Sequence, residues 1–137
     1  MSDINLNNQN QNKFIRLIKK FGYAFNGLKM AVTNHTSFIT HITIGFAICF
    51  LSIFFKISCT ELMFILSAIF LVLISELINT AIEESINLFT KDFHRGAMIA
   101  KDSAAAAVLL SSFYSILIGI IVFFPKVYSL LKFHELI

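Results

Sequence analysis

The chain has 137 residues, of which 57% are hydrophobic, and it carries 16 Phe and a single Pro. This composition excludes an ordinary soluble domain, and the length allows no more than one domain. The net charge of +3 does not indicate nucleic-acid binding, because the basic residues are distributed around three long apolar runs. We therefore predict an all-α membrane protein.

The N-terminal part of the chain is expected to lie outside the bilayer. Residues 1–12 are rich in Asn and Gln, which predicts a disordered tail. Residues 13–33 place apolar side chains on one side of a helix and basic side chains on the other, a pattern typical of an amphipathic helix on a membrane surface. Residues 13–137 are expected to form one integral membrane domain.

Three apolar runs each supply the roughly 20 residues that cross a bilayer. The cap-like sequence at 33–36 breaks the chain before a first span at about 37–55. A short turn then leads to a second span at about 62–89, and a polar loop leads to a third at about 103–124. Pro125 is expected to end that last helix.

The basic residues predict the orientation of the spans. Eight of the 11 Lys and Arg residues either precede the first span or lie between the second and the third. The positive-inside rule therefore places the N-terminus and the second loop in the cytoplasm and the C-terminus outside.

The second span carries polar residues that an apolar helix ordinarily excludes. At 100° per residue, Glu76, Asn79 and Glu83 share one face, and Glu83 lies roughly 10 Å beyond Glu76 along the axis. Ionisable groups at membrane depth are costly and indicate function. Glu84 points about 80° away and has the position of a solvated end residue. The alternative is that these side chains only form hydrogen bonds with neighbouring helices.

These residue types suit phosphoryl transfer at a membrane surface. Glu76 can act as a general base toward a lipid hydroxyl, and Glu83 can hold Mg²⁺, which prefers oxygen ligands. Lys101 and Arg16 can neutralise phosphoryl charge. Taken alone, the residues predict a membrane site for a cation or a phosphate, and a small transporter or proton channel is the alternative. The position of the polar residues at the cytoplasmic end favours phosphoryl transfer over transport, because a transport carboxylate belongs near the midplane.

The sequence E-L-I-N-T-A-I-E at 76–83, followed by A-K-D at 100–102 and by Ala105, is a specific signature. With F-I-R-L-I-K-K-F-G-Y-A-F-N-G-L-K at 14–29 and N-x-x-x-F at 34–38, it makes the chain similar to the prokaryotic diacylglycerol kinase family. These are small three-span membrane enzymes that include undecaprenol kinases. The resemblance covers about residues 14–124.

This resemblance implies phosphorylation of a membrane lipid alcohol by ATP with Mg²⁺. The first substrate expected is diacylglycerol, which gives phosphatidic acid in phospholipid metabolism, and undecaprenol is the alternative. The resemblance also implies a homotrimer whose active sites are shared between subunits. The enzyme is expected in the bacterial plasma (inner) membrane with its active site on the cytoplasmic side. Its partners are then ATP and membrane lipids, with no nucleic acid.

The resemblance also implies roles for individual residues. Glu76 is the proton acceptor with Asn79 as its polar neighbour, and Glu83 and His35 hold the metal. The positions that contact ATP are Arg16, Tyr23, His35, Glu83, Asp92, Phe93, His94, Lys101 and Asp102. The positions that contact lipid are Arg16, Met30, Ala31, Val32, Thr33, Ser37, Phe38, Ile39, Thr40, His41, Phe54, Leu62, Glu76 and Ala105.

Two positions depart from the family's usual pattern. Where this chain has His35, the family usually has a glutamate that helps to hold the metal, and a neutral imidazole is a poorer Mg²⁺ ligand than a carboxylate. Glu84 or water is then the alternative ligand. Where this chain has Asn87, the family commonly has an aspartate.

Overall fold

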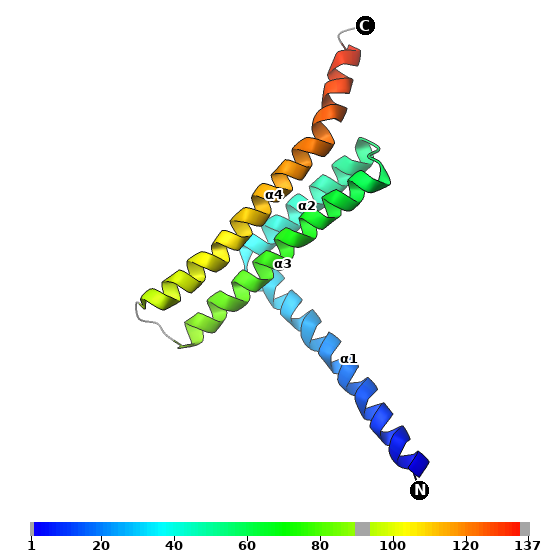
Figure 1. Cartoon of the computed structure of the whole chain (residues 1–137), viewed down its shortest axis with the longest axis vertical. Helices are drawn as coiled ribbons and strands as arrows, with labels where there is room; N and C mark the ends of the chain where they lie inside the picture. The colour runs from blue at the N-terminus through cyan, green and yellow to red at the C-terminus, as the bar shows by residue number, and fades with distance from the viewer. Residues whose placement is uncertain (1, 90–93, 135–137) are drawn as a thin grey trace. The chain divides into compact units, whose positions relative to one another are not determined.

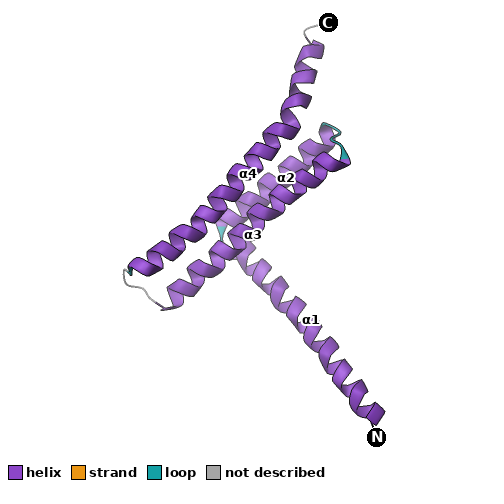
Figure 2. Cartoon of the chain, in the orientation of Figure 1, coloured by secondary structure: helices purple, strands orange, loops and turns teal. Residues whose placement is uncertain are grey.

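The structure, a computed structural model, describes the backbone of residues 2–89 and 94–134 and the side chains of residues 15–89 and 94–132. Every regular element in these residues is an α-helix (Figure 2). The four helices are α1 (Ser2–Asn34), α2 (Thr36–Phe54), α3 (Cys59–Phe89) and α4 (Arg95–His134). The prediction of an all-helical fold is confirmed.

Helix α1 forms one unit of the chain and residues from Thr36 onward form another, so each is described by itself. Helix α1 begins at Ser2 and thus includes the residues for which composition predicts a disordered tail. Helical hydrogen bonds are internal to the helix, so a polar stretch can continue one without an apolar core. Among residues 15–34, Ala31 is buried and the other side chains are exposed.

Helices α2, α3 and α4 are each long and apolar enough to cross a membrane. Helix α3 packs against both α2 and α4, and Figure 1 shows it running beside each of them. The core is small: Ile65, Val122 and Phe123 are buried together, with partly buried apolar side chains around them. Most other large apolar side chains of the three helices are exposed, as is expected of surfaces that face lipid.

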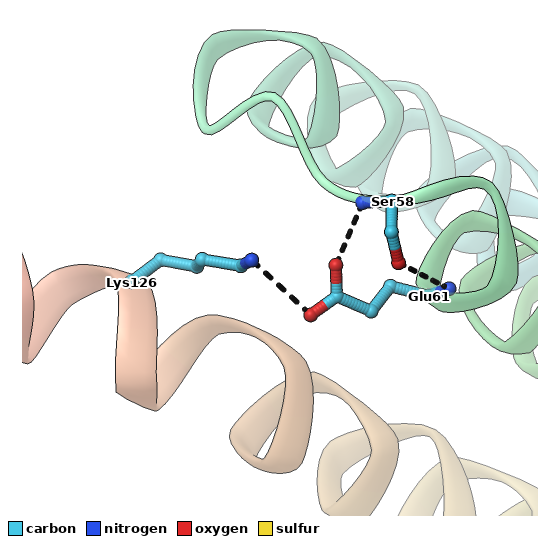
Figure 3. Close-up of polar contacts among 3 residues, drawn as sticks. All are labelled: Ser58, Glu61 and Lys126. Atoms are coloured by element: carbon cyan, nitrogen blue, oxygen red, sulfur yellow. Dashed lines mark hydrogen bonds and ion pairs between the residues drawn. The ribbon is translucent and has the colours of Figure 1, made fainter.

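The turn between α2 and α3 is closed by two capping motifs. The N–H of Ile57 donates to the carbonyl of Ser52 and that of Lys56 to the carbonyl of Ile53, which is the Schellman pattern. Lys56 takes the left-handed conformation that this motif requires, with φ of 49°. At the start of α3, the backbone N–H of Ser58 donates to Glu61 Oε2 at 2.7 Å, and the Glu61 N–H donates to Ser58 Oγ at 3.2 Å (Figure 3). The predicted short turn is confirmed.

The prediction that Pro125 ends the last helix is wrong, because α4 continues through it to His134. Proline removes one backbone donor, and a helix can continue past it when the surrounding contacts favour the helical path. Two such contacts flank it: Phe123 is buried in the core, and Lys126 Nζ lies 3.3 Å from Glu61 Oε1 (Figure 3). The ion pair joins α4 to the first turn of α3.

A close contact at Gly45 marks the packing register of α2 on α3. A Cβ atom added at Gly45 would lie 3.1 Å from Ile69 Cγ2, so a larger residue would require the Ile69 side chain to shift by a few tenths of an ångström. This register brings the start of α2 beside the middle of α3, where the predicted site residues lie.

Candidate active site

The centre of the candidate site is the contact between Ser37 and Glu76. Ser37, in the first turn of α2, donates a hydrogen bond from Oγ to Glu76 Oε1 on α3. The Glu76 side chain is 4% exposed, although a carboxylate in an apolar helix is costly to bury without such donors. The sequence predicted both residues at the site but did not predict their contact.

Other hydroxyls in the spans behave differently from Ser37. Thr40, Thr43 and Ser52 each donate to a carbonyl four residues earlier in their own helix, which is the usual way to satisfy a hydroxyl in a membrane. Ser37 instead reaches across to another helix. A hydroxyl donor at Glu76 is therefore a specific feature of the candidate site.

One turn further along α3, Asn79 and Glu83 are joined. Asn79 Nδ2 donates to Glu83 Oε1 at 3.1 Å, and the Asn79 side chain is buried with 9% exposure. Asn79 Oδ1 is buried without a hydrogen-bond partner in the structure. Since buried polar atoms are nearly always paired, this oxygen is available to a bound group.

Beyond Glu83, the last turns of α3 meet the start of α4. Lys101 Nζ donates to Asn87 Oδ1 at 2.7 Å. Lys101 is half-buried and Asn87 is exposed. Asn87 has no predicted role and differs in the sequence only by its departure from the family's usual aspartate. The signal that points to a role is helical spacing, because Asn87 lies 11 residues beyond Glu76 and therefore on the same stripe.

The predicted polar face of α3 is thus present in the structure. Glu76 and Asn79 are buried, Glu83 is half-buried, and Glu84 is exposed as expected from its angle. Lys101 joins this face through Asn87. The alternative, that these polar side chains only form hydrogen bonds with neighbouring helices, does not account for the unpaired Asn79 oxygen.

The predicted residues of α1 belong to the other unit of the chain. Arg16 and Tyr23 are exposed, as are Met30, Val32 and Thr33. His35 follows the end of α1, is half-buried, and donates its backbone N–H to the Ala31 carbonyl at 3.2 Å. The assignment of these residues to ATP, lipid or metal stays a prediction.

Some predicted ATP contacts lie around the loop before α4. Asp92 and Phe93 fall outside the residues that the structure describes. His94 is exposed, and its carbonyl accepts the first hydrogen bond of α4, from the N–H of Met98 at 3.0 Å. Asp102 is exposed next to Lys101. Nothing in these positions tests the predicted nucleotide contacts.

The predicted lipid contacts are spread over the length of the bundle. Phe38 is buried with 1% exposure, whereas Ala105 is exposed. Phe54 and Leu62 flank the opposite turn, and Leu62 is 14 residues before Glu76, roughly 20 Å along the helix. One molecule can touch both ends only if it has a long chain. Ile39 and Thr40 lie exposed on the first turns of α2.

A pocket of about 290 Å³ lies among α2, α3 and α4. It includes His41 and Val72, each one turn from the Ser37–Glu76 contact toward the turn between α2 and α3, and extends past Gly45 to Gly119. Its lining is mostly apolar, with Ser112 and Ser115 on α4. The pocket has the chemistry to receive a hydrocarbon group whose polar end lies near Glu76.

The described residues contain no group of three or more His, Cys, Asp or Glu side chains that could hold a metal ion by themselves. Mg²⁺ does not need such a group, because it is commonly held by one or two carboxylates together with substrate phosphates and water. The Glu83 carboxylate and the unpaired Asn79 oxygen, one turn apart on α3, are oxygen donors of this kind. The residues therefore fit Mg²⁺ bound together with a nucleotide.

Comparison with known proteins decides the family. Residues 22–123 match the model of the family described as prokaryotic diacylglycerol kinase. The chain belongs to this family. The match includes the whole polar face of α3 and Lys101, whereas Arg16 precedes it.

Individual members of the prokaryotic diacylglycerol kinase family align over most of the chain. It is 33% identical over 116 residues to an undecaprenol kinase of Bacillus subtilis, covering 85% of this chain and 94% of the relative. It is 31% identical over 116 residues to a diacylglycerol kinase of Synechocystis sp., covering 84% of this chain and 66% of the relative. It is 28% identical over 102 residues to the diacylglycerol kinase of Escherichia coli K12, covering 74% and 84%.

This member of the prokaryotic diacylglycerol kinase family is a lipid kinase. The finding confirms the prediction of an enzyme and replaces the transporter and channel alternatives. The family includes kinases of two different lipid alcohols, so family membership by itself leaves the lipid open.

Proposed function

We propose that this lipid kinase transfers the γ-phosphoryl group of ATP to the hydroxyl of a membrane lipid alcohol, with Glu76 as the general base. The observation that supports this most is the buried Glu76 carboxylate, which already accepts a hydrogen bond from a hydroxyl, that of Ser37. A lipid hydroxyl at the same oxygen would be placed for proton transfer to the carboxylate as it attacks phosphorus.

The other polar residues have complementary roles in the proposal. Asn79 orients the Glu83 carboxylate, and these two residues would hold Mg²⁺. When bound, the metal would neutralise charge on the phosphates. Lys101, and Arg16 from α1, would bind phosphate oxygens and stabilise the charge of the transferring group.

We propose diacylglycerol as the substrate, which would make the product phosphatidic acid. The relatives from Synechocystis sp. and Escherichia coli carry this activity in their names. Undecaprenol is the second candidate, and it is favoured by the 33% identity with an undecaprenol kinase that aligns over 94% of its length. Either lipid has a hydrocarbon chain long enough to extend from Glu76 toward the far turn.

Substrate identity is tested by giving the purified full-length chain labelled ATP, Mg²⁺ and each lipid alcohol separately. We expect kcat/KM for diacylglycerol to exceed that for undecaprenol. The reverse ranking would transfer the assignment to undecaprenol without affecting the role of Glu76. A soluble alcohol without a long chain serves as the control for the need for a hydrocarbon group.

The proposed enzyme is a homotrimer in the bacterial inner membrane, with its N-terminus and active site in the cytoplasm. The basic residues before α2 and between α3 and α4 support this orientation. The amphipathic pattern of residues 13–33 supports a position of α1 on the membrane surface. A trimer with shared sites would allow the α1 residues of one subunit to complete the polar face of another.

We propose that His35 also contributes to the metal site, as the resemblance to the family implies, and this gives a separate prediction. We expect His35→Glu to lower the Mg²⁺ concentration needed for half-maximal rate, because a carboxylate is the better Mg²⁺ ligand. The measurement is a Mg²⁺ titration of lipid phosphorylation at fixed ATP, with His35→Gln as the control that removes the imidazole without adding charge. An equal or higher requirement in His35→Glu would place residue 35 outside the metal shell.

A further inference from the structure

The polar face of α3 is longer than the catalytic motif. Residues 76, 83 and 87 fall within about 40° of one another around the helix, and residue 79 lies next to them. Asn87 is one turn, roughly 6 Å, beyond Glu83. The face therefore runs from the buried carboxylate at Glu76 to an exposed amide at the end of the helix.

The amide of Asn87 is bonded to the one side chain of α4 that the proposal assigns to phosphate binding. Lys101 Nζ lies 2.7 Å from Asn87 Oδ1, a strong charge-assisted hydrogen bond. A lysine ammonium is a mobile charge on a four-carbon stem and has three donors. One donor bonded to Asn87 restricts the stem, while two donors stay available to phosphate oxygens.

We propose that Asn87 is a positioning residue for phosphoryl transfer, which holds the Lys101 ammonium one helical turn from Glu83. The phosphates of a nucleotide whose metal is bound to Glu83 would then also contact the Lys101 ammonium. The inference rests on the proposed function, because the position of the Lys101 ammonium matters only if the protein binds a phosphate substrate.

The placement also explains why the cation comes from α4. The last turns of α3 lie beside the first turns of α4, and the Asn87–Lys101 bond joins the two helices there. The amide accepts a hydrogen bond without carrying a charge of its own, so it orients Lys101 without cancelling its attraction for phosphate.

A double-mutant cycle on the full-length chain tests this. Asn87→Ala keeps the helix, because alanine is a good helix former and the site is exposed. We expect it to weaken MgATP, seen as an increase of about 10-fold in both the Kd and the KM, since a hydrogen bond to a charged group is lost. In the Lys101→Met background we expect Asn87→Ala to change the nucleotide Kd by less than about twofold.

Two further variants separate positioning from structure. Asn87→Gln keeps a neutral side-chain oxygen for Lys101 and should retain more of the MgATP affinity than Asn87→Ala. Ser85→Ala removes an exposed hydroxyl that bonds to the Ala81 carbonyl of its own helix, and should leave both nucleotide binding and rate unchanged. Binding is measured directly with a fluorescent nucleotide, so the cycle can be completed even if Lys101→Met is inactive.

An equal loss from Asn87→Ala in both backgrounds would overturn the inference, and so would an unchanged Kd in the single variant. Both results would leave the proposed function intact if the parent chain phosphorylates lipid. A parent chain that binds no MgATP would refute the proposed function and this inference together.

Discussion

Replacing Glu76 with glutamine is expected to slow lipid phosphorylation by about 10²–10⁴-fold, the usual contribution of general-base catalysis. Glutamine has nearly the same size and can still accept a hydrogen bond from Ser37 Oγ, so the α2–α3 contact should persist. The amide cannot take the proton of an attacking hydroxyl. The measurement is the initial rate of labelled phosphate transfer from ATP to lipid.

The same variant should bind MgATP with an affinity close to that of the parent, because Glu76 is not among the proposed metal and phosphate contacts. A lower rate of lipid phosphorylation with an unchanged affinity for MgATP distinguishes loss of the general base from misfolding. Ser37→Ala is the matched control, since it removes the hydroxyl partner of Glu76 and retains the carboxylate. A rate in Glu76→Gln within a few-fold of the parent would remove Glu76 from the mechanism.

The second large effect is expected at Glu83. Glu83→Gln should raise the Mg²⁺ concentration for half-maximal rate by about 10-fold or more and also slow turnover, because a neutral amide is a weak ligand for a hard cation. The amide oxygen can still accept from Asn79 Nδ2, so the local structure should be maintained. The measurement is a Mg²⁺ titration at saturating lipid.

Glu76→Gln serves as the comparison in that titration. Both variants change a carboxylate to an amide on the same face of α3, but only Glu83→Gln is expected to shift the Mg²⁺ requirement. Equal shifts in the two variants would indicate that the metal is held by the whole face. No shift in either would place the metal away from α3.

The spans and the polar face of α3 were predictable because both depend on local periodicity. Apolar runs of about 20 residues have few alternatives to a membrane helix, and 100° per residue decides which side chains share a face. This reasoning located Glu76, Asn79 and Glu83, and it applies equally to Asn87. That residue was not assigned a role because its partner, Lys101, comes from another helix.

The contact between Ser37 and Glu76 was not predictable from periodicity, because it depends on the register of α2 against α3. That register is set by the close approach at Gly45 and by the caps of the turn. The Ser58-x-x-Glu61 capping box is visible in the sequence and marks the start of α3 within a residue. Which serine on α2 lies beside which carboxylate on α3 can be known only from the packed structure.

The continuation of α4 through Pro125 shows the limit of a local rule. A proline inside a helical pattern ordinarily predicts a helix end, and here the buried Phe123 and the Lys126–Glu61 ion pair keep the chain on the helical path. Contacts between helices decided the outcome. For the same reason, local periodicity does not predict which residues of α1 belong to the site.

Transfer of labelled phosphate from ATP to a lipid alcohol, measured side by side for the parent chain and Glu76→Gln, tests most directly whether the buried carboxylate of α3 is the base of a lipid kinase. We expect phosphorylated lipid from the parent only when ATP, Mg²⁺ and lipid are all present, and a rate lower by about 10²–10⁴-fold from the variant. No phosphorylated lipid from the parent with either diacylglycerol or undecaprenol, or equal rates for the two proteins, would contradict it.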